Sequence, residues 1–174
     1  MHRLPLAVAA LLLAACQTPP AQPSSQAASD ARQVIDSLYA AFDFEGDREP
    51  DWETMGAHFL EGATFVSPAN SRRTPTASDA STFLADFKTW VRTGEFHTTG
   101  LHERVLCVRI ELFGGIAHAW VAFEGFLPTN GEVQTRGLDS IQLARDLGQW
   151  KLVSFSTQYA SQEAPLPERF LLDG

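Results

Sequence analysis

The sequence predicts an α+β fold in which three N-terminal helices pack in a curved antiparallel sheet that forms a cone, or α+β barrel. Three observations support this fold class. Apolar residues recur at helical spacing before Gly94, apolar and polar residues alternate after it, and glycine-containing turns divide the alternating half into four segments. The expected order of elements is α-α-β-α-β-β-β-β, within a single domain that covers residues 30–160.

The helical half contains three apolar stripes. The first predicted helix begins at Asp30, and its stripe consists of Val34, Ile35, Leu38, Ala41 and Phe42. A shorter helix is expected from about residue 50, followed by a strand at 62–66 and a loop at 67–77. The third helix is expected at 78–93, with Gly94 at the position of a C-terminal cap.

The second half is expected to form an antiparallel meander. Its strands are predicted at 95–112, 116–127, 133–145 and 149–159. A two-residue turn at Gly114-Gly115 would pair three apolar residues with three others: Ile110 with Ala119, Val108 with Val121, and Leu106 with Phe123. If the alternation continues, this concave face also includes Ile141, Leu143, Val153 and Phe155.

Three segments carry a resemblance to a known family. They are Phe113-Gly114-Gly115-Ile116-Ala117-His118-Ala119-Trp120, Arg136-Gly137-Leu138-Asp139-Ser140-Ile141-Gln142-Leu143 and Trp150-Lys151-Leu152-Val153-Ser154. With the order of elements, they resemble the nuclear transport factor 2-like superfamily, and its SnoaL-like domains in particular. The resemblance implies a cone with a pocket at its open end and frequent dimerisation through the sheet. It does not imply one reaction, because members include ketosteroid isomerase, scytalone dehydratase, polyketide cyclases and non-catalytic binding or scaffold proteins.

The N-terminus predicts export and lipidation. Residues 1–15 read as a signal peptide, with a basic start and an apolar run too short to cross about 30 Å of hydrocarbon. Leu13-Ala14-Ala15-Cys16 resembles the lipobox of bacterial lipoproteins, which implies cleavage before Cys16 and acylation of that cysteine. By the family's sorting rule, Gln17 then implies the outer membrane, with the domain facing the periplasm. The alternative is an ordinary cleaved signal peptide.

Residues 16–29 are expected to form the lipidated cysteine and a disordered tether, since residues 17–29 contain no charge and no aromatic side chain. Residues 161–174 are expected to form a tail across the domain surface. Removal of residues 1–15 takes away Arg3 and changes the net charge from −8 to −9. Such an acidic domain is not expected to bind nucleic acid. Acylation of Cys16 leaves Cys107, which is expected to be a small buried hydrophobe.

Asp139 is the first candidate catalytic residue. It has the same parity as Ile141 and Leu143, so it is expected to point a carboxyl group into an apolar concave face. Burial there would raise its pKa and suit it to act as a general acid or base. Alternatively, a bulge turns Asp139 outward, or it has a structural partner.

His102 and Arg104 share the parity of Leu106 and Val108, so unbroken alternation points both inward. His102 could then assist Asp139, and Arg104 could bind an anionic or carbonyl group. A bulge between Gly100 and Val105 would turn both outward. The aromatic residues expected to line the pocket are Tyr39, Trp52, Phe65, Trp90 and Phe123; ordinary core packing is the alternative.

No metal or cofactor is predicted, because the histidines lack HxH or HExxH spacing and no nucleotide-binding fingerprint is present. The convex face is expected to be unusually apolar, with Ile116, His118, Trp120, Leu138, Trp150 and Leu152. We therefore expect either a homodimer that buries Trp120 and Trp150, or cover by the tail.

These observations favour a lipid-anchored envelope protein whose domain binds a small, largely apolar molecule without chemistry. One alternative is a cofactor-free isomerase, cyclase or dehydratase that uses Asp139 with His102. Another is an envelope scaffold that offers its sheet to a protein partner.

Overall fold

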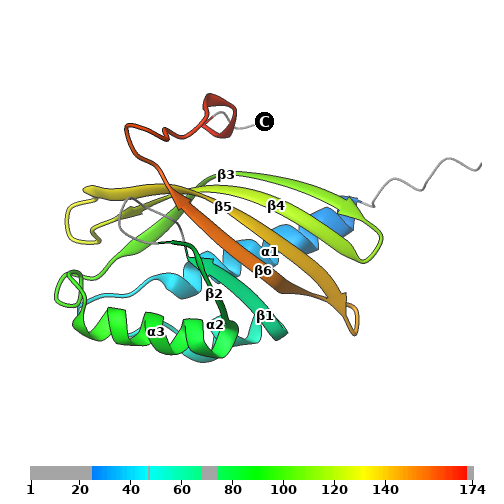
Figure 1. The fold of residues 1–174 in the computed structure, drawn as a ribbon, viewed down its shortest axis with the longest axis horizontal. Helices are drawn as coiled ribbons and strands as arrows, with labels where there is room; N and C mark the ends of the chain where they lie inside the picture. Colours follow the sequence, from blue (N-terminus) through cyan, green and yellow to red (C-terminus); the bar gives the residue numbers. More distant parts are fainter. Residues whose placement is uncertain (1–24, 47, 68–73, 172–174) are drawn as a thin grey trace, which may run out of the picture.

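The computed structural model describes residues 25–46, 48–67 and 74–171. Figure 1 shows α1, α2 and α3 on one side of a six-stranded sheet and the C-terminal segment on the other. The helices are α1 (Ser25–Phe42), α2 (Trp52–Ala57), α3 (Ala80–Thr93) and the short 3-10 helix η1 (Glu168–Phe170). The strands are β1 (Phe59–Ser67), β2 (Thr76–Asp79), β3 (His102–Phe113), β4 (Ile116–Phe126), β5 (Val133–Asp146) and β6 (Gln149–Tyr159).

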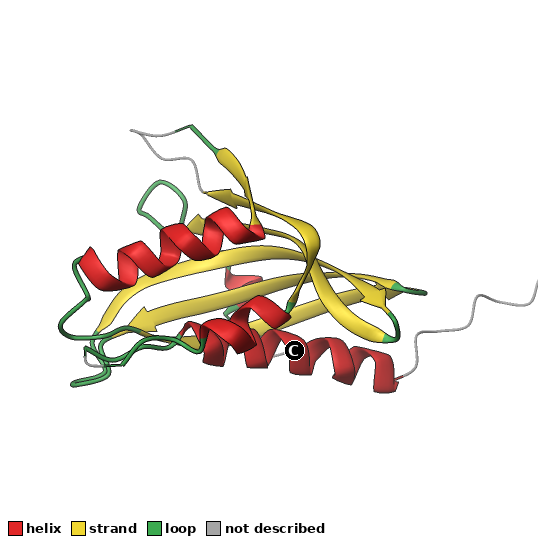
Figure 2. Cartoon of the chain, turned by 90° about the horizontal axis from the view of Figure 1, so that it is seen from below, coloured by secondary structure: helices red, strands yellow, loops and turns green. Residues whose placement is uncertain are grey.

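The α+β fold class is confirmed. The sheet is curved and unclosed, with strand order β2-β1-β6-β5-β4-β3, and Figure 2 shows the helices lying along it. The meander from β3 to β6 is antiparallel, as predicted, but β1 pairs with β6 in parallel. The short strand β2, which pairs with β1 at the edge, replaces the end of the predicted loop at 67–77 and the first two residues of the predicted helix at 78–93. It was not predicted because Thr76–Asp79 has no apolar alternation.

The helices end close to their predicted boundaries. Asp51 caps α2 by accepting a hydrogen bond from the Thr54 backbone N–H at 3.0 Å, and Asp79 caps α3 through the Thr82 N–H at 2.7 Å. Gly94 follows α3 as its C-terminal cap. The start of α1 corrects the predicted tether, because residues 25–29 are helical. A side-chain hydrogen bond of 2.7 Å from Gln26 to Asp30 supports this extra turn.

A β-bulge changes the parity of β3. Val108 pairs with Val121 and Ile110 with Ala119, as predicted, but the register then shifts, and Val105, not Leu106, pairs with Phe123. One additional residue in β3 thus reverses the direction of every side chain before it. The expectation that His102 and Arg104 point inward is therefore wrong, and Glu103 takes that direction instead.

A second bulge corrects the predicted faces of β6. The β5–β6 register shifts between the pairs Gln142–Ser154 and Leu143–Leu152. Because Val153 is the additional residue, Leu152 and Trp150 turn toward the helices and join the main core, where both are buried. Trp150 is therefore not part of the convex face, and the predicted dimer surface loses one of its two tryptophans.

The main hydrophobic core lies between the concave face of the sheet and the helices. Ile35 and Leu38 of α1 are fully buried there, together with Val121 of β4 and Ile141 of β5. A separate small cluster lies on the convex face, where Phe170 of η1 packs over Cys107 and Ala122. The described part of the C-terminal segment, which ends at Leu171, therefore lies across the convex face, and Cys107 is buried as expected. Within the described ranges, no helix is long and apolar enough to cross a membrane.

Candidate functional site

A cavity of about 920 Å³ opens between α3, the β1–β2 edge and the ends of β3, β5 and β6. This volume lies within the range of small-molecule binding sites. Nine of its lining residues are aromatic: Phe42, Phe44, Phe65, Phe83, Phe87, Trp90, Phe96, Phe155 and Tyr159. Of the residues predicted to bind a ligand, Phe65 and Trp90 thus line the cavity. Tyr39, Trp52 and Phe123 are not among its lining residues.

Aromatic stacking builds the wall that α3 provides. The Phe65 and Phe83 rings lie 3.9 Å apart between centroids and are nearly parallel. Phe83 stacks with Phe87 at 5.9 Å, and Phe87 stacks with Trp90 at 5.6 Å. Phe83, Phe87 and Trp90 recur at helical spacing, so one face of α3 presents a continuous aromatic surface to the cavity.

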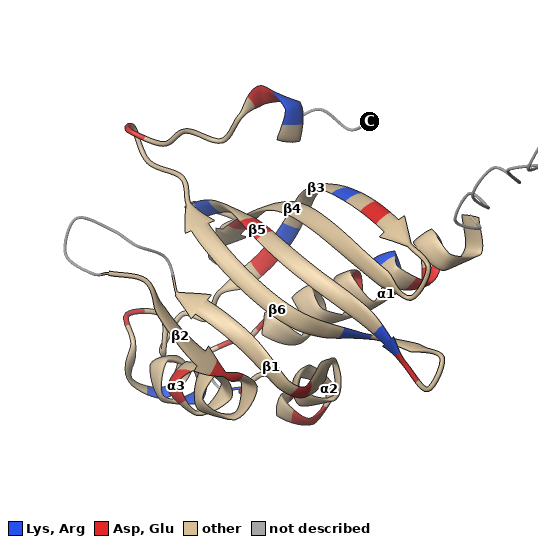
Figure 3. Cartoon of the chain, turned by 45° about the vertical axis from the view of Figure 1, so that its right-hand side comes forward, with Lys and Arg blue, Asp and Glu red and all other residues tan. Residues whose placement is uncertain are grey.

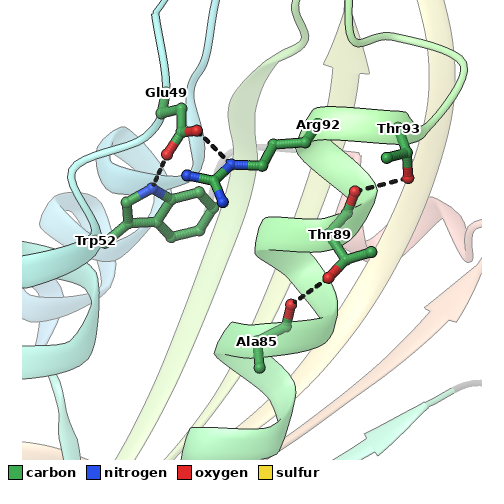
Figure 4. A network of polar contacts seen from close by, with 6 residues as sticks. All are labelled: Glu49, Trp52, Ala85, Thr89, Arg92 and Thr93. Carbon is green, nitrogen blue, oxygen red and sulfur yellow. Dashed lines mark hydrogen bonds and ion pairs between the residues drawn. The ribbon is translucent and has the colours of Figure 1, made fainter.

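Polar contacts hold α3 in place. Figure 4 shows Glu49 accepting a hydrogen bond from Trp52 Nε1 at 2.7 Å while it pairs with Arg92 Nε at 2.5 Å. Glu49 thereby connects the start of α2 to the last turn of α3. In the same view, the hydroxyl groups of Thr89 and Thr93 donate back to carbonyl oxygens of α3. Trp52 also contacts the Phe87 ring at 5.8 Å, which places it behind the cavity wall as a packing residue.

Asp139 is buried on the concave face, as its parity predicted, and only 2% of it is exposed. The hydroxyl group of Tyr39 in α1 donates a hydrogen bond to Asp139 Oδ2. Oδ1 is buried and has no hydrogen-bond partner among the described residues. Burial raises the pKa of Asp139 to about 7, although its contacts with the Tyr39 and Thr157 side chains act in the opposite direction. The Tyr39 pKa is also raised, mainly by burial and then by the neighbouring Asp139.

Glu103 is a further acidic residue of the cavity, at a position that unbroken alternation along β3 predicts to face outward. It is half-buried in β3, and its backbone N–H donates to Asp43 Oδ1 at 2.7 Å. Burial, and then the charges of Asp139 and Asp43, raise the pKa of Glu103 to about 8. The sequence does contain an indication of this direction. Leu101 and Val105 are apolar and lie two residues before and after Glu103, so all three side chains point to the same face, which the bulge makes the inner one.

The carboxyl groups of Asp139 and Glu103 lie at different distances from the cavity. Asp139 does not line the cavity, whereas Thr157, its partner on β6, does. Asp139 therefore lies behind the wall, next to Thr157 and Tyr39. Glu103 contacts the cavity directly. Tyr159 also lines the cavity, and burial followed by the charges of Glu103 and Asp139 raises its pKa to about 12. The group thus contains two carboxyls that titrate near neutral pH and two tyrosines that stay protonated.

His102 and Arg104 lie on the other face and are not brought together with Asp139. His102 Nε2 is 3.8 Å from Glu45 Oε1, and its ring meets Phe126. Arg104 pairs with Glu124, whose second oxygen accepts a hydrogen bond from Arg136 Nε at 3.1 Å. Figure 3 shows basic and acidic residues next to each other at this part of the sheet. The two arginines offset the cost of burying Glu124 and lower its pKa despite that burial.

All charged residues that line the cavity within the described part of the chain are acidic. They are Asp86 and Glu95, which are exposed at the rim, and the half-buried Glu103. Among the described lining residues there is no lysine, arginine or histidine. No group of three or more His, Cys, Asp or Glu residues with a geometry that could hold a metal ion occurs within the described ranges.

The convex face has a partial cover. Phe170 of η1 contacts the Trp120 ring at 6.0 Å, and Arg109 Nη2 donates to the Arg169 carbonyl at 2.6 Å. Trp120 remains 39% exposed, and Ile116 remains 59% exposed. The tail therefore covers part of the apolar surface that the sequence indicated, and a dimer through Trp120 stays a prediction.

No protein-family model matches the chain, and no curated protein sequence matches it. Solved structures do match. A protein of unknown function with a cystatin-like fold from Nostoc punctiforme has a TM-score of 0.65 at 10% identity, covering 84% of this chain and 99% of that one.

Two further solved structures are described as NTF2-like proteins of unknown function. The one from Pseudomonas putida has a TM-score of 0.64 at 15% identity, covering 82% of this chain and 93% of that one. The one from Shewanella baltica has a TM-score of 0.55 at 16% identity, covering 81% and 99%. The TM-scores show that these proteins share the fold of this chain. At sequence identities this low, a shared fold says nothing about a shared activity. The chain therefore has the nuclear transport factor 2-like, or cystatin-like, cone fold that its sequence resembles.

Proposed function

We propose that the protein binds a small, largely apolar molecule in the cavity under α3. The observation that supports this proposal is the cavity itself, of about 920 Å³, with nine aromatic residues in its walls. Enclosing an apolar molecule there would remove apolar surface from water at about 25 cal/mol per Å². A scaffold would instead be expected to have a filled cone, and the open cavity argues for a ligand.

A cavity-filling variant tests this proposal. Ser78 pairs with Phe65 in the β1–β2 register, and both residues line the cavity, so Ser78→Trp would place an indole inside it. Gln142→Trp adds the same group on the exposed convex face and is the control. The measurement is fluorescence titration with the uncharged apolar dye N-phenyl-1-naphthylamine, together with native mass spectrometry for a retained ligand.

We expect the wild-type protein and Gln142→Trp to bind the dye with equal affinity, and Ser78→Trp to bind it at least about tenfold more weakly. Circular dichroism checks that both variants are folded. Equal dye binding by all three proteins, with no ligand retained by the wild-type protein, would contradict the proposal.

A second candidate function is acid–base catalysis without a cofactor. The observation that favours it is the position of Glu103, which lines the cavity and, with a pKa of about 8, is mostly protonated at neutral pH. A protonated carboxyl group that contacts a bound molecule can act as a general acid. Asp139 with Tyr39 would then support Glu103 from behind the wall, and His102 has no part in this mechanism.

The retained molecule separates the two functions. It is extracted, incubated with the wild-type protein or with Glu103→Gln, and examined by NMR. Conversion by the wild-type protein alone would favour catalysis, and recovery of the unchanged molecule from both would favour binding.

We also propose that Cys16 is acylated and anchors the protein in the outer membrane, facing the periplasm. Cys16 lies outside the described residues, and the support is the segment Leu13-Ala14-Ala15-Cys16 followed by Gln17. Expression in a two-membrane bacterium, followed by membrane fractionation, tests it. Cys16→Ala should release the protein from the outer-membrane fraction, and Cys107→Ala, at the other cysteine, should not. Retention of Cys16→Ala in the membrane would overturn the proposal.

A further inference from the structure

The acidic residues that line the cavity indicate the charge of the ligand, which the volume of the cavity does not. We propose that the bound molecule is a cation, an amine or quaternary ammonium group carried on an apolar body. This inference rests on the proposed binding function. It follows from the combination of aromatic walls with three acidic side chains, Asp86, Glu95 and Glu103, and from the absence of a basic residue among the described lining residues.

The aromatic walls provide a suitable environment for an ammonium group. Trp90 contacts three other rings that line the cavity: Phe44 at 5.9 Å, Phe87 at 5.6 Å and Phe96 at 5.9 Å. Aromatic faces attract cations, tryptophan most strongly, and several rings together form the kind of cage that binds quaternary ammonium groups. These rings belong to α3, to the chain after α1 and to the turn before β3, so the fold brings them together from distant segments.

The carboxyl groups disfavour an anion and favour a cation. Glu103 contacts the cavity, and Asp43 and Asp139 lie behind it, close enough for their charges to affect Glu103. Within the described ranges, an anionic ligand would meet these groups without a basic partner among the lining residues, because the bulge in β3 places His102 and Arg104 on the opposite face. A cation would instead compensate the three carboxyl groups, in a site where charges interact more strongly than in water.

A matched pair of probes tests the charge separately from the shape. Phenethyltrimethylammonium and (3,3-dimethylbutyl)benzene differ in a quaternary nitrogen that is replaced by carbon. Each is titrated at pH 8 against protein with bound N-phenyl-1-naphthylamine, and displacement of this uncharged dye gives the affinity. The protein is the full chain with Cys16→Ser, so that no acyl chain can compete for the cavity.

We expect the cation to bind at least about tenfold more tightly than its carbon analogue. Glu103→Gln should reduce this ratio to below about threefold. Glu111→Gln is the same substitution on the same strand, at an exposed position paired with His118, and should leave the ratio unchanged. If Glu103→Gln does not fold, the rim variant Asp86→Asn with Glu95→Gln takes its place, and a smaller decrease in the ratio is expected because the rim is exposed.

The outcomes distinguish the two proposals. If the dye binds but both probes displace it equally, or the carbon analogue binds more tightly, the cation inference is overturned and ligand binding stands. An unchanged ratio in Glu103→Gln and in the rim variant would also overturn it. If neither the dye nor a probe binds, the proposed function fails, and this inference fails with it.

Discussion

Tyr39 in α1 and Asp139 in β5 are joined by a hydrogen bond in which the tyrosine hydroxyl donates to the buried carboxyl group. This contact connects the first helix to a central strand of the sheet. A carboxyl group in an apolar core is costly when ionised, and one donor compensates only one of its oxygens. The free energy of unfolding should therefore depend on whether Asp139 is protonated. The same holds for Glu103, whose pKa is also raised by burial.

We expect the free energy of unfolding to fall as the pH rises from about 4 to about 8. Asp139 has a pKa of about 7 and Glu103 of about 8 in the folded protein, whereas both titrate near about 4 when unfolded. The folded state thus retains protons that the unfolded state releases in this range, and each proton retained favours folding at the lower pH. The other groups that face Glu103, which are Asp43, Tyr39 and Tyr159, supply no positive charge to reverse this trend.

Urea unfolding across this pH range measures the effect. Asp139→Asn should flatten the decrease, and Asp146→Asn, the same change at the exposed end of β5, should reproduce the wild-type slope. A wild-type stability that stays constant or rises between pH 4 and pH 8 would contradict the prediction.

Tyr39→Phe should destabilise the protein by about 1–3 kcal/mol, because it leaves a second oxygen of Asp139 without a partner. The loss should be larger at pH 8 than at pH 5, since the ionised carboxyl needs the donor more. The pKa of Asp139, followed by NMR, should rise above about 7, because the Tyr39 contact lowers it in the wild-type protein. Tyr159→Phe removes the hydroxyl of the other tyrosine and should leave the Asp139–Tyr39 bond intact. An unchanged Asp139 pKa in Tyr39→Phe would contradict this assignment.

Gly137→Ala should destabilise the protein by about 1–3 kcal/mol through overpacking. A Cβ at residue 137 would lie 2.5 Å from two ring carbons of Phe123, which packs against Tyr39. Gly115→Ala is the matched control, since its Cβ would come no closer than 4.0 Å to Arg145. Its stability should lie within about 0.5 kcal/mol of the wild-type value in the same urea titration. Equal stabilities of the two variants would show that Phe123 is free to move.

Phe170→Ala should expose the thiol of Cys107 to reagents in solution. Phe170 is 3% exposed and packs over Cys107 and Ala122 on the convex face. Leu171→Ala, at the adjacent and half-exposed position, is the control and should leave the rate of thiol labelling unchanged. Labelling of Cys107 with a disulfide reagent, followed spectrophotometrically, should be at least about tenfold faster in Phe170→Ala, because the tail then opens more readily. Equal rates in the three proteins would show that η1 does not protect this face.

Much of the architecture could be predicted from the sequence because apolar periodicity carries it. The pairs Val108–Val121 and Ile110–Ala119 follow from the turn at Gly114-Gly115, and the burial of Asp139 follows from the parity it shares with Ile141. These inferences hold because no bulge separates the residues compared.

The errors arise where one additional residue interrupts a strand. Leu106 and Val153 are ordinary β-forming residues, so nothing in their chemistry marks the bulges that reverse Arg104 and Trp150. The sequence predicts that a pocket exists but not its volume or its lining residues. These depend on how side chains from α3, β1 and β6 pack together in the folded protein. Glu103 was missed because the alternation was continued unbroken through Leu106.

The bulge in β3 determines which side chains of this strand face the cavity. With the additional residue, the interior receives the carboxyl of Glu103, and without it the same strand would turn the imidazole of His102 and the guanidinium of Arg104 toward the cavity. A single inserted amino acid therefore decides whether this strand presents an acidic or a basic side chain to the cavity. Gain or loss of that residue would exchange an acidic for a basic side chain at the cavity in one step, with the rest of the sheet unchanged.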